Sequence, residues 1–203
     1  MKKIIIKEIS KNAFRQRGFS SGTFAGCFNC PCGNDKKGGA CCRFGCDVDK
    51  KSYELMIKYK KKFESVIGKN LEECFLGKWI NSTDYLGGSY RRSKVRKENG
   101  FCIFHSIEGK GCELIKLVMK NKISRKMIPT ICRLYPLTWE NNQMFVYDER
   151  YSSIEKGCDC TIKRIKKITD KSIVESQRKE FKDIFEFKGK ASKDLKIQVL
   201  NST

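Results

Sequence analysis

The stretch GGACCRFGC, residues 38–46, places two cysteines side by side and a third four residues later. The whole chain holds 12 cysteines and 1 histidine in 203 residues. With 39% hydrophobic residues, a chain of this length can bury a core without disulfide bonds. Bulk stability therefore does not require the cysteines, and their number calls for a chemical role.

The start of the chain does not predict a secretory signal. Only three isoleucines separate Met1-Lys2-Lys3 from Lys7, whereas a signal peptide needs about 7 to 15 apolar residues. No window approaches the roughly 18 apolar residues of a membrane span. We therefore expect a cytoplasmic protein in which cysteines serve as metal ligands rather than as disulfides.

The composition is strongly basic, with 43 Lys and Arg against 23 Asp and Glu and a formal net charge of +20. Four thiolates around a divalent ion carry a net charge of about −2, so a metal-loaded protein would stay basic. Basic runs at 58–62, 91–97 and 163–167 suggest an acidic protein or a weak, non-specific nucleic-acid partner. A solvated, lysine-rich surface accounts for the same charge.

The pattern predicts an α+β fold, a small irregular domain with several helices and short strands organised around a cysteine metal cluster. We expect an N-terminal strand and loop at 1–26, a cysteine-rich metal-chelating domain at 27–160 and a basic helical C-terminal appendage at 161–203. The last segment has no cysteine after Cys160.

Periodicity and capping residues predict the individual elements. Asp49 and Gly68 bound an amphipathic helix, and Ser172 with Glu175 forms a capping box for a helix to about residue 185. Further helices are expected at 71–76 and 112–121, strands at 2–8, 101–104 and 144–147, and a polar loop or hairpin at 84–100. Residues 131–138 are expected to be extended, because Pro136 disfavours helical angles at the residue before it.

The cysteine spacing indicates metal binding without choosing the metal. Cys27, Cys30 and Cys32 form C-x2-C-x-C, whose tight turn lets two thiolates reach one ion at about 2.3 Å. Adjacent Cys41 and Cys42 would point to opposite sides of an extended backbone, so they serve neighbouring sites, or one is a ligand and the other a buried small side chain. Thiolate ligands suit zinc or an iron-sulfur cluster, and no run matches the ferredoxin spacing.

Two further residues carry alternatives. His105 follows Cys102 by three residues and is a non-thiol ligand, a general base or a hydrogen-bonded residue without either role. Cys74 precedes Phe75 and Leu76, which favours a place in the core. The chain shows neither a glycine-rich phosphate loop nor a Ser-His-Asp set, so the residues by themselves support no mainstream enzyme class. Whether the protein is an enzyme is left open.

Several of these motifs together resemble the zinc- or iron-chelating domain of the YkgJ-type cysteine-cluster proteins. The resemblance covers roughly residues 27–160 and rests on GGACC at 38–42, GFCIF at 100–104, Cys112 and PTICRLYPL at 129–137. That family has a Gly-x-Cys-Cys knot, a C-[IVP]-[FY] strand, a further cysteine and a Pro-x-x-Cys-Arg-x-[FY]-Pro box. The box falls on Pro129, Cys132, Arg133, Tyr135 and Pro136.

The resemblance implies a set of metal ligands. They are Cys41, Cys42, Cys102, Cys112 and Cys132, with Cys158 as the C-terminal partner. The remaining candidates form a second site or enlarge the first: Cys27, Cys30, Cys32, Cys46 and Cys160.

The expected function is that of a cytosolic cysteine-cluster protein that binds zinc or iron, the latter as an ion or an iron-sulfur cluster. A related branch resembles flagellin lysine methylases, so the alternative is an iron-sulfur or zinc-dependent enzyme such as a protein lysine methyltransferase. The second alternative is a nucleic-acid-associated metalloprotein. Likeness of fold alone does not decide between these functions.

Overall fold

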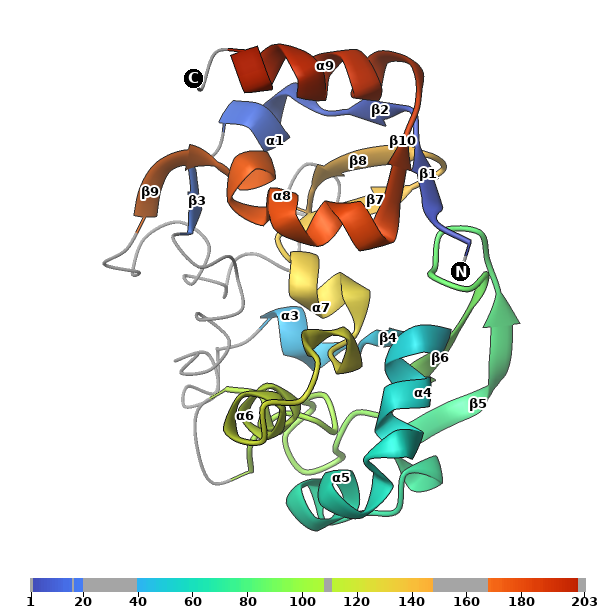
Figure 1. Ribbon diagram of the computed structural model, residues 1–203. Coiled ribbons are helices and arrows are strands. Elements are labelled where there is room, and N and C mark those ends of the chain that lie inside the picture. Colours follow the sequence, from blue (N-terminus) through green and yellow to red (C-terminus); the bar gives the residue numbers. More distant parts are fainter. Residues whose placement is uncertain (1, 16, 20–39, 108–110, 148–167, 201–203) are drawn as a thin grey trace.

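The computed structural model describes residues 2–15, 17–19, 40–107, 111–147 and 168–200 (Figure 1). Helices and short strands alternate along the described chain, and the strands form small sheets of two or three members. The α+β class predicted from the sequence is confirmed. Two buried clusters of hydrophobic side chains divide the molecule into two halves.

The middle of the chain builds the lower half in Figure 1. Its elements are α3 (Ala40–Arg43), β4 (Asp47–Asp49), α4 (Lys50–Lys58), α5 (Lys60–Ile67), η2 (Glu72–Cys74), β5 (Phe75–Asn81), β6 (Ser89–Ser93), α6 (Glu113–Lys120) and η3 (Arg125–Met127). β6 lies between β4 and β5 and pairs antiparallel with both. The centre of this lower half contains four fully buried side chains, those of Met56, Phe63, Phe104 and Leu114. We call the buried cluster to which they belong the first core.

The two ends of the chain meet in the upper half. Its elements are β1 (Ile4–Ile6), β2 (Glu8–Ile9), α1 (Lys11–Arg15), β3 (Arg17–Phe19), β7 (Leu137–Glu140), β8 (Gln143–Val146), β9 (Ile168–Ser172), α8 (Ile173–Ile184), β10 (Phe185–Phe187) and α9 (Gly189–Leu200). β1 pairs in parallel with β10, and β2 pairs in parallel with β8. We call the buried cluster of this upper half the second core. It contains described residues from all three segments expected from the sequence, 1–26, 27–160 and 161–203.

The predicted helix boundaries at Asp49, Gly68 and Ser172 are confirmed, but the single helix expected between Asp49 and Gly68 is wrong, because α4 ends before Tyr59 and α5 begins after it. Asp49 accepts a hydrogen bond from Ser52 N at 3.0 Å, and α5 ends at Gly68 in the left-handed conformation, φ 71°. Ser172 and Glu175 form both hydrogen bonds of a capping box. The expected strand at 2–8, the hairpin within 84–100, the helix at 112–121 and the strand at 144–147 correspond to β1 and β2, the turn into β6, α6 and β8.

Three other predicted elements are wrong. Residues 131–138 are not all extended, because α7 (Thr130–Leu134) precedes β7. Pro136 restricts only Tyr135, and Pro129 stands at the N-cap, where a helix needs no amide hydrogen from it. Residues 71–76 contain the short η2, and β5 then begins at Phe75, while residues 101–104 contribute only an isolated bridge at Cys102.

Helix α7 lies between the two halves and is held from both sides. On one side Asp49, 1% exposed, accepts hydrogen bonds from Thr130 N at 3.0 Å and Thr130 Oγ1 at 2.8 Å. On the other side Arg133, 4% exposed, donates to Glu180 of α8 at 2.8 Å. Ile131 packs against both cores. The position of α7 is therefore set by polar contacts as well as by packing.

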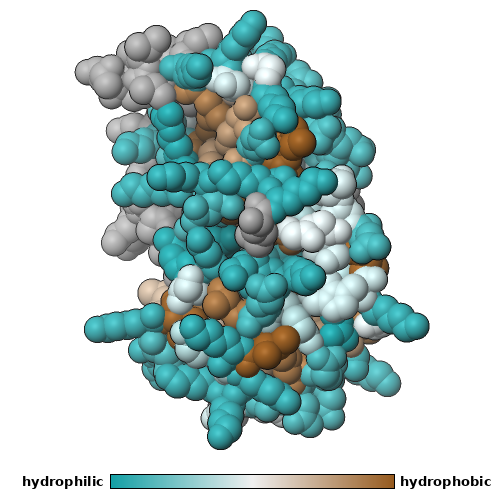
Figure 2. All heavy atoms as spheres, turned by 45° about the vertical axis from the view of Figure 1, so that its right-hand side comes forward, coloured by the Kyte–Doolittle hydropathy of each residue, from teal (hydrophilic) through white to brown (hydrophobic). Residues whose placement is uncertain are grey.

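Among the described residues, no helix has the length and hydrophobicity that a membrane span needs. On the face shown in Figure 2, hydrophilic side chains prevail, and hydrophobic side chains form only small separate areas.

Replacing Asp49 by alanine should lower the free energy of unfolding by about 3 to 5 kcal/mol, because it leaves buried donors of Ser52 and Thr130 without an acceptor. Glu54→Ala is the matched control on the same helix, since it removes only the exposed pair with Lys51 and should cost less than about 1 kcal/mol. Urea unfolding of both variants measures the difference. Equal costs would contradict the structural role of Asp49.

Candidate functional site

Five cysteines from separate segments gather beside α7. Cys46 Sγ lies 4.0 Å from Cys102 Sγ, and Cys46 and Cys132 are close enough to interact electrostatically. Cys42 and Cys112 are close enough to these thiols to interact with them electrostatically. We call the five residues Cys42, Cys46, Cys102, Cys112 and Cys132 the thiol cluster.

Backbone hydrogen bonds hold the segments that carry the cluster. Cys102 N donates to Cys42 O at 2.5 Å, which joins α3 to the turn at 102–105. Ser93 N donates to Cys46 O at 2.8 Å, and Glu113 N donates to Phe104 O at 2.8 Å at the start of α6. The main chain therefore brings the cysteines together without help from their side chains.

Ser93 of β6 places a buried hydroxyl between two of the thiols. Its Oγ accepts a hydrogen bond from Cys46 N at 2.8 Å and lies 3.5 Å from Cys46 Sγ and 3.4 Å from Cys102 Sγ. A hydroxyl at this position can donate to a thiolate and stabilise its charge. The sequence gives no sign of this role, because Ser93 is 47 residues from Cys46.

Neighbouring thiols and burial raise the pKa of Cys102 and of Cys112. For Cys102, the hydrogen bond with Cys46 is the largest contribution, and burial and the neighbouring Cys46 and Cys42 raise the pKa further. Burial also raises the pKa of Cys112, with smaller contributions from Cys42 and Cys102. In the absence of a cation, these thiols are therefore neutral at physiological pH.

The structure brings together four of the ligands implied by the resemblance, namely Cys42, Cys102, Cys112 and Cys132. The structure adds Cys46 to this group. The sequence analysis had assigned Cys46 either to a second site or to an enlarged first site. The other candidates Cys27, Cys30, Cys32, Cys158 and Cys160 lie outside the described residues.

Cys41 and Cys42 lie in helix α3, so the expected extended backbone at this pair is wrong. Successive side chains of a helix diverge by roughly 100° rather than pointing to opposite sides. Cys74 is fully buried in the first core, where it donates a hydrogen bond to Asn70 O at 3.4 Å, and it is not among the residues that line the cavity described below.

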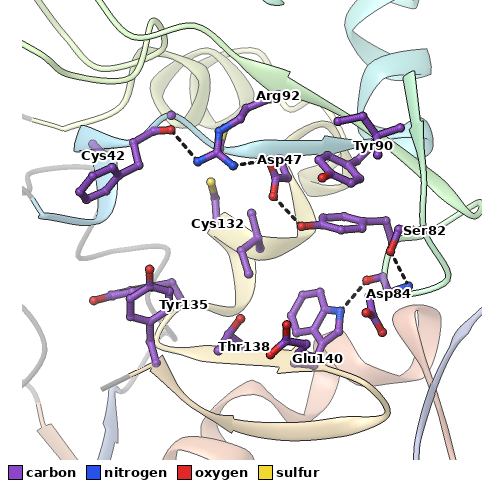
Figure 3. Close-up of a pocket in the computed structure, with 18 of the residues that line it drawn as sticks. Cys42, Asp47, Ser82, Asp84, Tyr90, Arg92, Cys132, Tyr135, Thr138 and Glu140 are labelled. Carbon is purple, nitrogen blue, oxygen red and sulfur yellow. Dashed lines mark hydrogen bonds and ion pairs between the residues drawn. The ribbon is translucent and has the colours of Figure 1, made fainter. Parts of the chain in front are cut away.

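A cavity of about 570 Å³ opens beside the thiol cluster. Cys42, Cys46, Cys112 and Cys132 line it together with His105, and Figure 3 shows Cys132 pointing into it near Arg92 and Asp47. The rest of the lining combines aromatic and charged side chains, among them Asp47, Asp84, Tyr85, Tyr90, Arg92, Trp139 and Glu140.

Hydrogen bonds and stacking order the aromatic wall of the cavity. Tyr85 stacks on Tyr90 with ring centres 4.1 Å apart and donates to Asp47 Oδ2 at 2.5 Å. Trp139 Nε1 donates to the backbone oxygen of Asp84 at 2.6 Å. Arg92 contacts Asp47 Oδ1 at 3.4 Å and Phe44 O at 3.0 Å, so its charge is largely engaged within the protein.

The thiols are close but do not surround a common point. Over the described ranges, no group of three or more Cys, His, Asp or Glu side chains has a geometry that could hold a metal ion. Ligation would therefore require rotation of thiol side chains toward one another, which their Cα–Cβ bonds permit.

No family model, curated protein or solved structure matches this chain. The resemblance to the YkgJ-type cysteine-cluster proteins therefore stays a prediction from the sequence motifs.

Gly45 should not tolerate a side chain. Its φ is +73°, and a Cβ there would lie 2.6 Å from Ser93 O and 2.9 Å from Ser93 Oγ. Gly45→Ala should destabilise the protein by about 2 to 4 kcal/mol and displace Cys46, because backbone strain and a clash with main chain act together.

Gly68→Ala separates these two effects. Gly68 has φ +71°, but a Cβ added there would meet open space, with nothing within 4 Å. Thermal or urea unfolding should show a loss of about 1 kcal/mol for this variant. If Gly45→Ala costs no more than Gly68→Ala, the close approach of Gly45 to Ser93 does not matter for stability.

Proposed function

We propose that the protein binds zinc or iron, the latter as an ion or an iron-sulfur cluster, through thiolates of the thiol cluster. The observation that carries the proposal is the convergence of five cysteines from four separate parts of the chain, with Cys46 and Cys102 in contact at 4.0 Å. The expected cytoplasmic location belongs to the same proposal, since it keeps these thiols reduced.

The spacing of the contacting thiols supports this proposal. Two thiolates bound to one tetrahedral zinc ion at about 2.3 Å lie about 3.8 Å apart, close to the 4.0 Å between Cys46 and Cys102. Rotation of further thiols of the cluster toward this ion would complete its ligand set. Ser93 Oγ is placed to donate its hydrogen to Cys102 Sγ, as outer hydrogen-bond donors do at metal sites.

The electrostatics of the cluster favour a cation. Deprotonation of one buried thiol is opposed by burial and by its neighbours, as the raised pKa values of Cys102 and Cys112 indicate. A divalent ion reverses this balance, because it stabilises several thiolates at once and releases their protons.

A bound ion would supply cross-links between distant segments and, in the case of iron, a redox-active centre. Cys42, Cys102 and Cys132 lie far apart in sequence, so an ion that joins them would close long loops. Its binding free energy would then contribute to folding.

The cavity supports the alternative function as an enzyme. A space of about 570 Å³ beside Cys42, Cys112 and Cys132 has the size of a small-molecule site. An iron-sulfur or zinc-dependent activity such as protein lysine methylation is the form that the resemblance suggests. This alternative keeps the thiol cluster as the metal site and adds a substrate next to it.

The internal contacts of the basic run at 91–97 weaken the nucleic-acid alternative. Arg91 pairs with Glu72 at 2.7 Å, and Arg96 is 8% exposed and donates to Ile103 O at 2.8 Å. These side chains stabilise β6 and its neighbours, so they offer little charge to phosphates. The run at 163–167 lies outside the described residues.

Protein purified without oxygen should contain stoichiometric zinc or iron by elemental analysis. Cys46→Ser and Cys102→Ser should each lower the metal content and increase protease sensitivity together, because the ion stabilises the fold. Chelation of the wild-type protein should have the same effect on proteolysis. Iron with sulfide and broad visible absorption would indicate a cluster, whereas colourless protein with zinc would indicate a zinc site.

Cys74→Ser is the matched control. It replaces a buried thiol outside the cluster, so it should keep the metal and cost about 1 to 3 kcal/mol from a polar group placed in the core. Full metal content in both Cys46→Ser and Cys102→Ser, or a Cys46–Cys102 disulfide in protein kept under reducing conditions, would contradict the proposal.

A further inference from the structure

His105 lies at the wall of the cavity beside the thiol cluster. It is the single histidine of the chain, and its side chain is buried, with 4% exposed. His105 N donates to Cys102 O at 2.8 Å, and the backbone of His105 forms a bridge with Cys112. The imidazole therefore comes from a main-chain segment that is bonded directly to two residues of the cluster.

The ring is held in one orientation and one tautomer. Its Nδ1 lies 2.8 Å from Ser106 O, and because a carbonyl oxygen only accepts, Nδ1 must carry the hydrogen. Phe101 stacks on the imidazole with ring centres 4.6 Å apart and planes inclined by 19°. Nε2 therefore presents a lone pair.

This lone pair has no hydrogen-bond partner within the described part of the chain. A buried acceptor left without a partner destabilises the folded state, so its retention calls for a ligand. A hydrogen bond from Nδ1–H to a backbone carbonyl, with Nε2 left as the donor atom, is the arrangement in which histidine binds metals.

A catalytic cysteine–histidine pair fits the site less well. Such a pair needs a thiol in hydrogen-bond contact with the imidazole, and Nε2 has no such contact among the described residues.

From these observations we propose that Nε2 of His105 is the nitrogen ligand of the metal centre, completing a mixed thiolate and imidazole donor set. The inference rests on the proposed metal binding and extends it. Mixed sulfur and nitrogen ligands are typical of zinc and are also found at iron-sulfur centres. Closure of the set requires the thiols to rotate toward Nε2, because the ring is already fixed by Phe101 and Ser106.

X-ray absorption at the metal edge tests this proposal on untagged protein, which its net charge of +20 allows to be purified by cation exchange. Because His105 is the single histidine, any imidazole scattering around the metal must come from this residue. We expect imidazole scattering in the wild type and its loss in His105→Gln. A shell of sulfur alone in the wild-type protein would overturn the proposal.

Cobalt(II) competition with a chelator gives a second readout. His105→Gln should weaken metal binding by at least about 10- to 100-fold, and His105→Cys should restore affinity with a stronger sulfur-to-cobalt charge-transfer band. Glu54→Ala, which changes an exposed side chain of α4 that does not line the cavity, is the control and should retain the wild-type spectrum. Circular dichroism of the metal-free variants checks that each is folded.

The outcomes separate the two proposals. Equal cobalt affinity and spectra for wild type, His105→Gln and His105→Cys, together with metal loss in Cys46→Ser, would refute ligation by His105 and leave metal binding intact. Failure of the wild-type protein to bind zinc, iron or cobalt would refute both.

Discussion

The buried carboxylate of Asp49 links the elements on which the candidate site depends. It caps α4 through Ser52 and at the same time accepts two hydrogen bonds from Thr130 at the start of α7. Arg133, one helical turn later, donates to Glu180 in the other half of the molecule. Since Cys132 lies between these two anchors, the polar contacts that join the halves also fix one of the five clustered thiols.

Without a cation, the thiols of the cluster do little to stabilise one another, whether they are protonated or deprotonated. Backbone hydrogen bonds from Cys102 and Ser93 hold the segments in place, and burial together with neighbouring sulfur raises the pKa of Cys102. A soft or borderline cation would supply the positive charge that these thiols lack. It would also give a partner to the imidazole nitrogen of His105, which has none within the described residues. This common explanation is why we favour metal binding over a packing role for these cysteines.

Local sequence signals predicted the elements whose causes are themselves local. Asp49, Gly68 and the Ser172–Glu175 box act within one helical turn, and the structure confirms all three. The errors came where a local rule was extended too far: Pro136 restricts Tyr135 alone, so α7 forms immediately before it. Likewise the α3 backbone at Cys41 and Cys42 is helical, although the sequence there has little helical periodicity.

The sequence by itself determined the abundance of thiols, the basic charge, the α+β class and the cysteines of the motifs, because these depend on composition and short-range pattern. Only the tertiary structure decided that Cys46 joins Cys102, that Ser93 lies between them and that His105 is buried at the same cavity. These contacts depend on how β4 and β6 pair and on how α7 docks against Asp49. Pairing and docking bring together residues 47 or more positions apart, and no short-range pattern encodes such distances.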